Sequence, residues 1–330
     1  MEEKTPVSKA SIWLGLVGIY LGWGTTYLAN HYALEAFPAF IMNGTRNLAA
    51  GIIMYAFQRA RGARPPTAKM WKSAFSVGLI MICCGSGINV WAQKIVPSGI
   101  ASLLIGSIPF WMAVLDIIAS RRAKTPGPGK MAIVGIVFGF AGIVLLIGPV
   151  NIMGTALMIS PLGAAALMAG SVLWAAGSLK SRTAVFPASR VLGSGMQMIG
   201  GGLGLILAGT LMGEPWRFQA QDVSAASIAG FVYLIIIGSL FSFAIYTWLL
   251  GVAPTPLVST YAYVNPIVAV ILGAIVLDEI ISLRLIVASA MILAAIAVVT
   301  LSSGMTRRGK AARAGESKPQ PCGQSRPDSE

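Results

Sequence analysis

Charged residues are scarce in this sequence, and their scarcity decides the class of protein. Only 11% of the 330 residues are charged, whereas 56% are hydrophobic. An ordinary soluble domain has about 25% charged residues, which cover its water-facing surface. The charges here gather in short clusters separated by apolar runs of roughly 20 residues, the length that crosses a hydrocarbon core. The sequence therefore predicts an integral membrane protein without a soluble domain.

Cysteine and histidine are also rare. Cys83 and Cys84 are adjacent within an apolar run, Cys322 lies in the C-terminal tail, and His31 is the only histidine. No CxxC or Cys/His spacing suggests a metal site. The chain also lacks the glycine-rich nucleotide-binding motifs and an acidic cluster within its apolar runs. These absences disfavour a membrane enzyme and ATP-driven work, and we expect neither a metal nor another cofactor.

Ten apolar runs, mostly bounded by proline, are what the sequence does contain. They cover residues 12–30, 40–58, 73–92, 98–119, 131–148, 161–179, 191–212, 226–249, 258–277 and 282–301. We expect an all-α integral membrane fold of ten transmembrane helices. The polar residues 304–330 are expected to form a disordered, basic cytoplasmic tail.

The basic residues predict the orientation of these helices. With the N-terminus placed in the cytoplasm, 20 of the 24 lysines and arginines fall in the cytoplasmic segments, as the positive-inside rule requires. Both termini are then cytoplasmic, in a multi-pass protein of the bacterial inner membrane. The net charge of +13 is explained by loops that face anionic lipid, so membrane lipid is an expected partner and nucleic acid is not.

The chain contains an internal repeat. Residues 96–116 align without gaps on residues 253–273 at an offset of 157, and 91 aligns on 248 at the same offset. The matched pairs are Pro97 and Pro254, Pro109 and Pro266, and Trp91 and Trp248; earlier in each half, Trp23 matches Trp174 at an offset of 151. The repeats are 12–148 and 161–301, with five helices each. An odd number of helices inverts the second copy in the membrane, as in many secondary transporters. Chance similarity among apolar helices is the alternative.

Several motifs resemble those of the drug/metabolite transporter superfamily, with two EamA-type repeats. They are Leu21-Gly22-Trp23-Gly24-Thr25-Thr26-Tyr27, Arg46, Val96-Pro97-Ser98-Gly99-Ile100-Ala101, Tyr261-Ala262-Tyr263-Val264-Asn265-Pro266 and Asp278-Glu279. The resemblance covers about residues 12–301. It implies ten helices around a central cavity and export of metabolites such as amino acids. The centre of each span lacks the carboxylate that proton-coupled carriers usually keep, which puts proton coupling in doubt.

Polar and aromatic residues recur at helical spacing on corresponding helices of both repeats. Amides and hydroxyls are costly in hydrocarbon unless they face protein or water, so the set predicts a cavity. The alternative for any single residue is a contact between helices. The candidate substrate contacts are Trp23, Tyr27, Asn89, Gln93, Trp174, Ser178, Tyr246, Tyr261 and Asn265. Asn265 is the strongest candidate because its amide can donate and accept.

Two prolines and three charges complete the candidate residues. Pro109 and Pro266 lie near the middle of the fourth and ninth helices, where each frees a carbonyl and produces a kink, either static or mobile. Arg46 is a charge well inside a span; it snorkels outward, forms an ion pair with Glu279 or Glu35, or attracts an anionic substrate group. Asp116 is expected near Arg121 at the interface, and is the one carboxylate placed to carry a coupling proton.

Together these features favour a secondary transporter that exports a small-molecule substrate by alternating access. The aromatic residues suggest a moderately apolar substrate such as an aromatic or branched amino acid. An uptake carrier, a channel and a non-transporting accessory protein remain alternatives. The sequence does not choose a substrate, a coupling ion or an oligomeric state.

Overall fold

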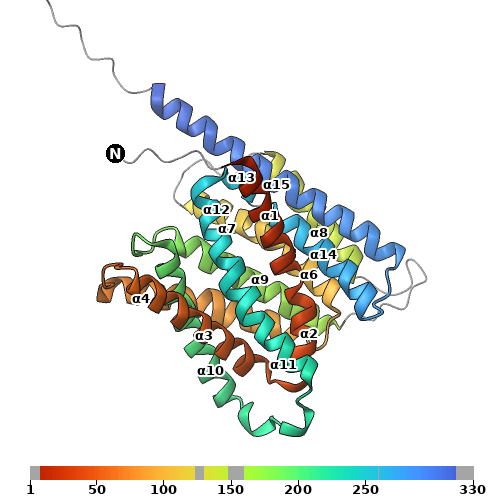
Figure 1. The fold of residues 1–330 in the computed structure, drawn as a ribbon. Coiled ribbons are helices and arrows are strands. Elements are labelled where there is room, and N and C mark those ends of the chain that lie inside the picture. Colours follow the sequence, from red (N-terminus) through yellow and green to blue (C-terminus); the bar gives the residue numbers. More distant parts are fainter. Residues whose placement is uncertain (1–7, 123–129, 148–159, 259, 317–330) are drawn as a thin grey trace, which may run out of the picture.

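A computed structural model describes residues 8–122, 130–147, 160–258 and 260–316, and within these ranges the secondary structure is helical, with no strand. The described part of the predicted tail continues the last helix to Glu316, and the rest of the tail lies outside the described residues. The bundle is drawn in Figure 1.

The first half of the chain forms α1 to α8. Their bounds are α1 Lys9–Gly24, α2 Thr26–Ala36, α3 Ala39–Ala60, α4 Ala68–Gly78, the π-helix η1 Leu79–Ser86, α5 Gly87–Ala92, α6 Ser98–Gly106, α7 Ile108–Arg122 and α8 Lys130–Ile147. Two of the predicted spans are broken. α1 ends where the Thr25 hydroxyl donates to the carbonyl of Leu21 at 2.6 Å. α6 ends at Ser107, and Pro109, which lacks an N–H, lies in the first turn of α7.

The second half forms α9 to α15. Their bounds are α9 Pro161–Ser181, α10 Arg190–Leu211, the 3-10 turns η3 Pro215–Arg217 and η4 Ala220–Asp222, α11 Ala225–Tyr233, the π-helix η5 Leu234–Phe241, α12 Ser242–Val252, α13 Thr255–Val258, α14 Tyr261–Val276 and α15 Leu283–Glu316. Pro266 lies within α14, which continues through it. Where the sequence predicted a kink at each proline, the helix breaks just before Pro109, whereas α14 continues as one helix through Pro266.

Within the ranges that the structure describes, seven stretches of helix are long and apolar enough to cross a membrane. They are Lys9–Ala36, Ala68–Ala92, Ser98–Arg121, Pro161–Ser181, Arg190–Leu211, Ala225–Leu250 and Leu283–Thr300. Met131–Ile147 and Tyr261–Val276 are apolar but shorter. α3 has 22 residues, but its polar residues Asn43, Arg46 and Asn47 lower its hydropathy. Each predicted run is thus helical over most of its described residues, apart from the breaks at Thr25 and Ser107 and single residues at the ends of some runs.

Glycines bring the helices of the two halves into backbone contact. A methyl group on Gly51 of α3 would lie 2.8 Å from the carbonyl oxygen of Gly195 on α10. In the same way, Gly135, Gly139 and Gly142 of α8 lie against α15. These glycines therefore serve the packing of helices within the protein. The α3–α10 and α8–α15 pairs are the most extensive contacts between helices.

Each half carries a π-helix at a corresponding position. η1 and η5 both contain eight residues and both precede the second part of a long span. Trp174 of α9 packs against Gly85 of η1, and Trp23 of α1 donates to the carbonyl of Gly238 of η5. Each of the two repeat-related tryptophans thus contacts the π-helix of the other half.

Candidate functional site

Three aromatic rings from three helices meet in the interior of the bundle. Trp23 of α1 lies 5.2 Å from Tyr246 of α12 and 4.9 Å from Tyr261 of α14, measured between ring centroids. The two tyrosine rings are 5.7 Å apart. These tilted and edge-on arrangements are those that aromatic pairs prefer. All three side chains keep partial exposure, so they border open space as well as one another.

The position of Trp23 depends on the π-helix η5. Its indole Nε1 donates to the carbonyl oxygen of Gly238 at 3.0 Å. A π-helix interrupts the regular hydrogen-bond ladder, which leaves such a carbonyl available to a side chain. A methyl group on Gly238 would lie 2.9 Å from Cγ2 of Thr26, so only glycine lets α2 approach this closely. The local sequence thus fixes the indole relative to η5.

Asn265 of α14, four residues after Tyr261 of this aromatic cluster, connects α14 to α1. With its amide nitrogen turned toward the neighbouring carbonyls, it donates to the backbone oxygen of Tyr261 at 3.1 Å and of Tyr20 at 3.2 Å. The hydroxyls of Tyr20 and Thr260 also form a hydrogen bond. Asn265 is buried, with 8% exposure. Its donor nitrogen is used in joining α14 to α1, which is a positioning task.

Arg46 lies inside the bundle without either of the ion pairs expected for it. Its Nε donates to the hydroxyl of Ser239 on η5 at 2.9 Å. Glu279 instead accepts hydrogen bonds from the backbone of α6, and Glu35 lies 3.5 Å from His31 on its own helix. The expectation of a pair with Glu279 or Glu35 was therefore wrong, because both carboxylates are taken up nearer to the ends of their helices.

The guanidinium of Arg46 has spare donors. Among the described residues, Arg46 is in no ion pair, and Nε alone of its nitrogens makes a hydrogen bond. The side chain is partly exposed although it lies inside the bundle. A methyl group on Gly238 would lie 3.7 Å from Nη2, which places this end of the guanidinium beside the carbonyl that holds Trp23. A cation with unused donors that is held at η5 can bind an anionic group.

A second polar group lies along α2 and α5. The amide of Asn30 donates to Gln93 at 3.2 Å, and Gln93 donates to the backbone carbonyl of Asn89 at 3.1 Å. The side-chain oxygens of Asn30 and Asn89 are buried and have no protein donor in the described part of the chain. Gly170 of α9 makes room for Asn89, since a methyl group there would lie 2.1 Å from its Oδ1. Two of the predicted site residues, Asn89 and Gln93, are thus brought together.

The remaining predicted residues differ in their relation to the aromatic cluster. Tyr27, on the first turn of α2, is near enough to Tyr261 for their phenol groups to interact electrostatically, whereas Ser178, Trp174 and Asp116 have partners outside the cluster. Ser178 donates to the carbonyl of Trp174 at 2.8 Å, a bond within its own helix that satisfies the hydroxyl. Trp174 packs against η1, and the structure records no ring contact between it and the aromatic cluster within the described residues. Asp116 pairs with Arg182 at 3.2 Å and not with the expected Arg121, because the end of α7 leans on α9.

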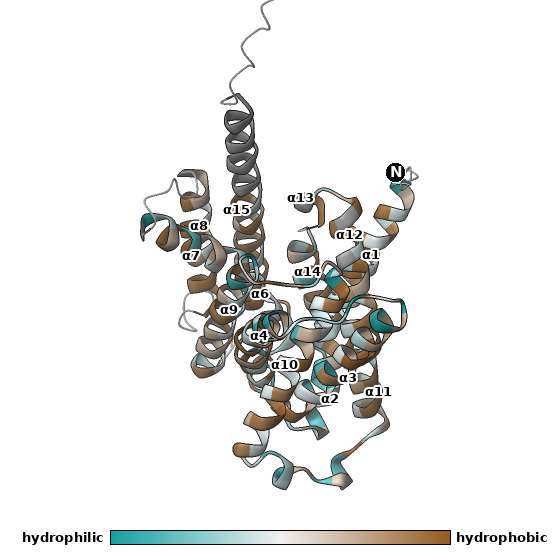
Figure 2. Cartoon of the chain, turned by 90° about the vertical axis from the view of Figure 1, so that its left-hand side faces the viewer, coloured by the Kyte–Doolittle hydropathy of each residue, from teal (hydrophilic) through white to brown (hydrophobic). Residues whose placement is uncertain are grey.

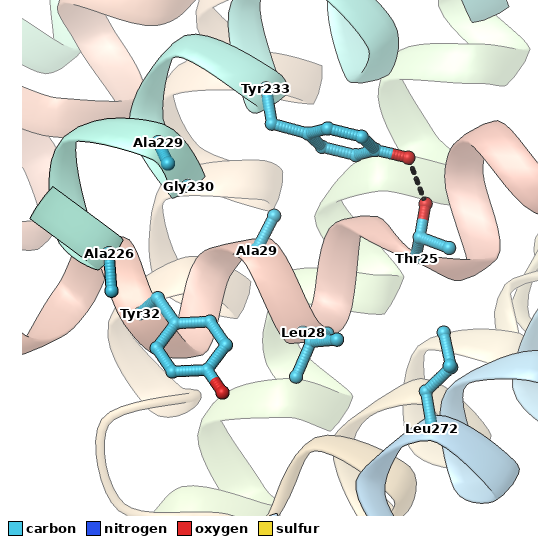
Figure 3. Close-up of a pocket in the computed structure, with 9 residues that line it drawn as sticks. All are labelled: Thr25, Leu28, Ala29, Tyr32, Ala226, Ala229, Gly230, Tyr233 and Leu272. Carbon is cyan, nitrogen blue, oxygen red and sulfur yellow. Dashed lines mark hydrogen bonds between the residues drawn. The ribbon is translucent and has the colours of Figure 1, made fainter. Parts of the chain in front are cut away.

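Sequence reasoning missed a cavity on the side of the bundle. It has a volume of about 440 Å³ and lies between α2, α11 and α14 (Figure 3). Its lining is almost entirely apolar; its hydroxyl groups are those of Thr25 and Tyr233, which bond to each other at 2.6 Å, and that of Tyr32. The signal in the sequence was the spacing of the small residues Ala226, Ala229 and Gly230, which leave one face of α11 bare.

A carboxylate outside the predicted set has a defined task. Glu214 accepts hydrogen bonds at 2.9 Å from the backbone N–H groups of both Phe40 and Ile41, at the start of α3. Its position beyond α10 gave no hint of this partner, 174 residues earlier in the chain. No group of three histidine, cysteine or acidic side chains that could hold a metal ion occurs among the described residues.

Comparison with known proteins connects this architecture to a family. The chain matches the EamA-like transporter family twice, over residues 9–148 and 161–301. It is 31% identical to the uncharacterised inner membrane transporter YedA of Escherichia coli K12, over 87% of this chain and 89% of that one. It is 29% identical to the protein PecM of Dickeya dadantii, over 87% and 92% of the two chains.

A solved crystal structure has the same fold. It superimposes with a TM-score of 0.58 at 21% sequence identity, over 92% of this chain and all of the other. The two family matches coincide closely with the repeats expected from the sequence, and the apolar helices fit a multi-pass protein of the inner membrane. The chain belongs to the EamA-like transporter family and is a membrane transporter.

Proposed function

We propose that this transporter exports a small metabolite from the cytoplasm by alternating access, using ten transmembrane helices in two inverted five-helix repeats. The pairing of helices supports the inversion. α3 packs on its repeat partner α10, α6 on α14, and α8 on α15, while α1 packs on α12 and α9 on η1. Exchanging every helix with the corresponding helix of the other repeat leaves this set of contacts unchanged. A two-fold axis in the membrane plane requires that property.

The positions of the first and the last helix support an even number of membrane crossings. The start of α1 and the far end of α15 lie at the same end of the bundle (Figure 1). The basic residues of the sequence favour the cytoplasm for this end. Both termini are then cytoplasmic, and the loop between α10 and α11 faces the periplasm.

The observation that carries the substrate site is Arg46, a cation in the bundle interior whose protein partner is a hydroxyl. Burying a charge without a counter-charge is costly, and a bound anionic group would compensate it. The rings of Trp23, Tyr246 and Tyr261 border the same region through η5 and offer an apolar surface. We infer a substrate with an anionic group and an apolar body, such as an aromatic or branched amino acid. Tyr27, Asn89 and Gln93 are further candidates for contacts, and Asn265 positions α14.

Metabolite profiling of the culture medium tests this proposal. Cells expressing the wild type are compared with cells expressing Arg46→Gln or, as a matched control, Arg217→Gln in the exposed turn η3, at equal membrane levels. One compound should be enriched outside by the wild type and by Arg217→Gln, and not by Arg46→Gln. Depletion of a compound from the medium would favour uptake, and identical profiles in all strains would favour an accessory role without transport.

A further inference from the structure

Glu279 holds two helices of different repeats together at one end of the bundle. Its Oε1 accepts a hydrogen bond from the backbone N–H of Ser98 at 2.7 Å, and its Oε2 accepts one from Gly99 at 3.0 Å. These N–H groups begin α6, whereas Glu279 follows α14. A carboxylate is favoured there by the exposed donors and by the dipole of the helix.

The local sequence is built around this carboxylate. A methyl group on Gly273 would lie 2.5 Å from Oε2 of Glu279, and one on Gly99 would lie 3.2 Å from it, so both positions must be small. Asp278 has a φ of 53°, a left-handed conformation that turns the chain back at the end of α14. The N–H of Glu279 then donates to the carbonyl of Gly273 at 3.0 Å. The carboxylate is therefore fixed in place.

α6 packs against α14 along its whole length. Gly99 at the start of α6 lies against Val270, and a methyl group on Gly106 at its end would lie 3.3 Å from Pro266 and 3.9 Å from the carbonyl oxygen of Ala262. Beyond the break at Ser107, α7 packs on α9, with smaller contacts to α8 and α15. Figure 2 shows α7 with α8 on one side, and α12 with α13 on the other. α6 and α14 are thus held together up to Ser107, and beyond it α7 turns toward α9 while α12 and α13 lie on the other side, so the segments separate at the end opposite to Glu279.

The other end of this pair has no equivalent of the carboxylate. In the gapless register of the repeat, Glu279 corresponds to Arg122, and Ser98 and Gly99 correspond to Thr255 and Pro256. Arginine cannot accept these hydrogen bonds, and proline has no N–H to donate. The inverted repeat would place such a contact at both ends, but the sequence provides it at one.

We propose that the Glu279 carboxylate is a one-sided latch between α6 and α14, which sets the resting state of the transporter with its α7–α13 end open. This inference rests on the proposed alternating access. In the proposed orientation the latched end is periplasmic, so the resting site faces the cytoplasm, where an exported substrate is loaded. Opening toward the periplasm then requires both hydrogen bonds of the latch to break, whereas opening toward the cytoplasm requires no such step.

Cysteine accessibility tests the latch without a substrate. Val270→Cys, in the α6–α14 contact, is introduced into a chain with Cys83, Cys84 and Cys322 replaced by serine. Intact cells are labelled with a membrane-impermeant maleimide, and the signal is normalised to labelling after denaturation. With Glu279→Ala, labelling should be faster by about tenfold or more, the factor expected on loss of a charge-assisted hydrogen bond.

Glu214→Ala is the matched control. It removes the same chemistry from the start of α3, whose contact with α10 extends from Ile41 beside Gly209 to Tyr55 beside Gly195. Labelling of Val270→Cys should therefore stay at the reference rate. Glu279→Gln, which keeps one acceptor oxygen and the side-chain volume, should increase labelling less than Glu279→Ala, and it serves as the test if the alanine variant does not reach the membrane.

An unchanged rate in both Glu279 variants, or an equal increase with Glu214→Ala, would overturn the latch. Because labelling needs no transported compound, this result is separate from metabolite profiling. If Glu279→Ala speeds labelling but no compound is exported, the proposed function is refuted and the latch stands. If a compound is exported but labelling does not respond to the Glu279 variants, the latch is refuted and the proposed function stands.

Discussion

The contact between α3 and α10 makes a strong prediction about stability, because backbone approaches backbone there. A methyl group on Gly202 would lie 2.7 Å from the backbone nitrogen of Leu48 and 2.8 Å from the carbonyl oxygen of Gly44. Neither atom belongs to a side chain that could rotate away, so Gly202→Ala must push the helices apart. Overpacking of this kind costs roughly 1–3 kcal/mol, against a gain of up to about 1 kcal/mol in helix propensity.

Gly193→Ala on the same helix is the control. Its added methyl would meet Cδ1 of Phe186 at 3.4 Å, an ordinary van der Waals contact. Thermal unfolding of both variants in one detergent, followed by light scattering, should show a midpoint lowered by several degrees for Gly202→Ala. Gly193→Ala should unfold at or above the wild-type temperature. Equal midpoints for the two variants would refute the close approach of the two backbones.

Three further predictions concern individual contacts, each measured by the same unfolding assay. Gly170→Ala should lower the thermal unfolding midpoint, because the added methyl would lie 2.1 Å from Oδ1 of Asn89. This fall should be larger than any rise caused by Gly193→Ala, and an unchanged midpoint would contradict this packing. Tyr233→Phe should cost about 0.5–1.5 kcal/mol through loss of its 2.6 Å hydrogen bond, and a cost of zero would argue against that bond. Asp116→Asn should cost less than about 1 kcal/mol, because both partners of its ion pair are 40% exposed; a larger loss would show that the pair is desolvated.

Much of the fold could be predicted from the sequence because hydrocarbon leaves few options for a chain. Apolar runs of one length, proline at their borders and the register of Pro109 on Pro266 were enough to find the helices and the two repeats. The breaks within spans were less accessible. The break at Thr25 depends on a hydroxyl bond to the preceding turn, and neither π-helix has a distinctive residue pattern.

The candidate site could be predicted only in part. Helical spacing placed Trp23, Tyr246 and Tyr261 among the candidate substrate contacts, and the structure brings their three rings together. The partners of charges could not be read in the same way. Glu279 and Glu214 each find backbone N–H groups more than 170 residues away, and such donors are invisible in a list of side chains. Arg46 was therefore expected to pair with a carboxylate that the fold uses for another helix.

Counterflow in proteoliposomes tests the central claim most directly, with the compound that metabolite profiling identifies. Purified wild-type protein should exchange labelled for unlabelled compound with saturable kinetics, and Arg46→Gln and protein-free liposomes should not. Flux that rises linearly with concentration would indicate a channel. Absence of flux, or equal saturable exchange by Arg46→Gln, would contradict a carrier whose substrate binds at the cation beside Trp23.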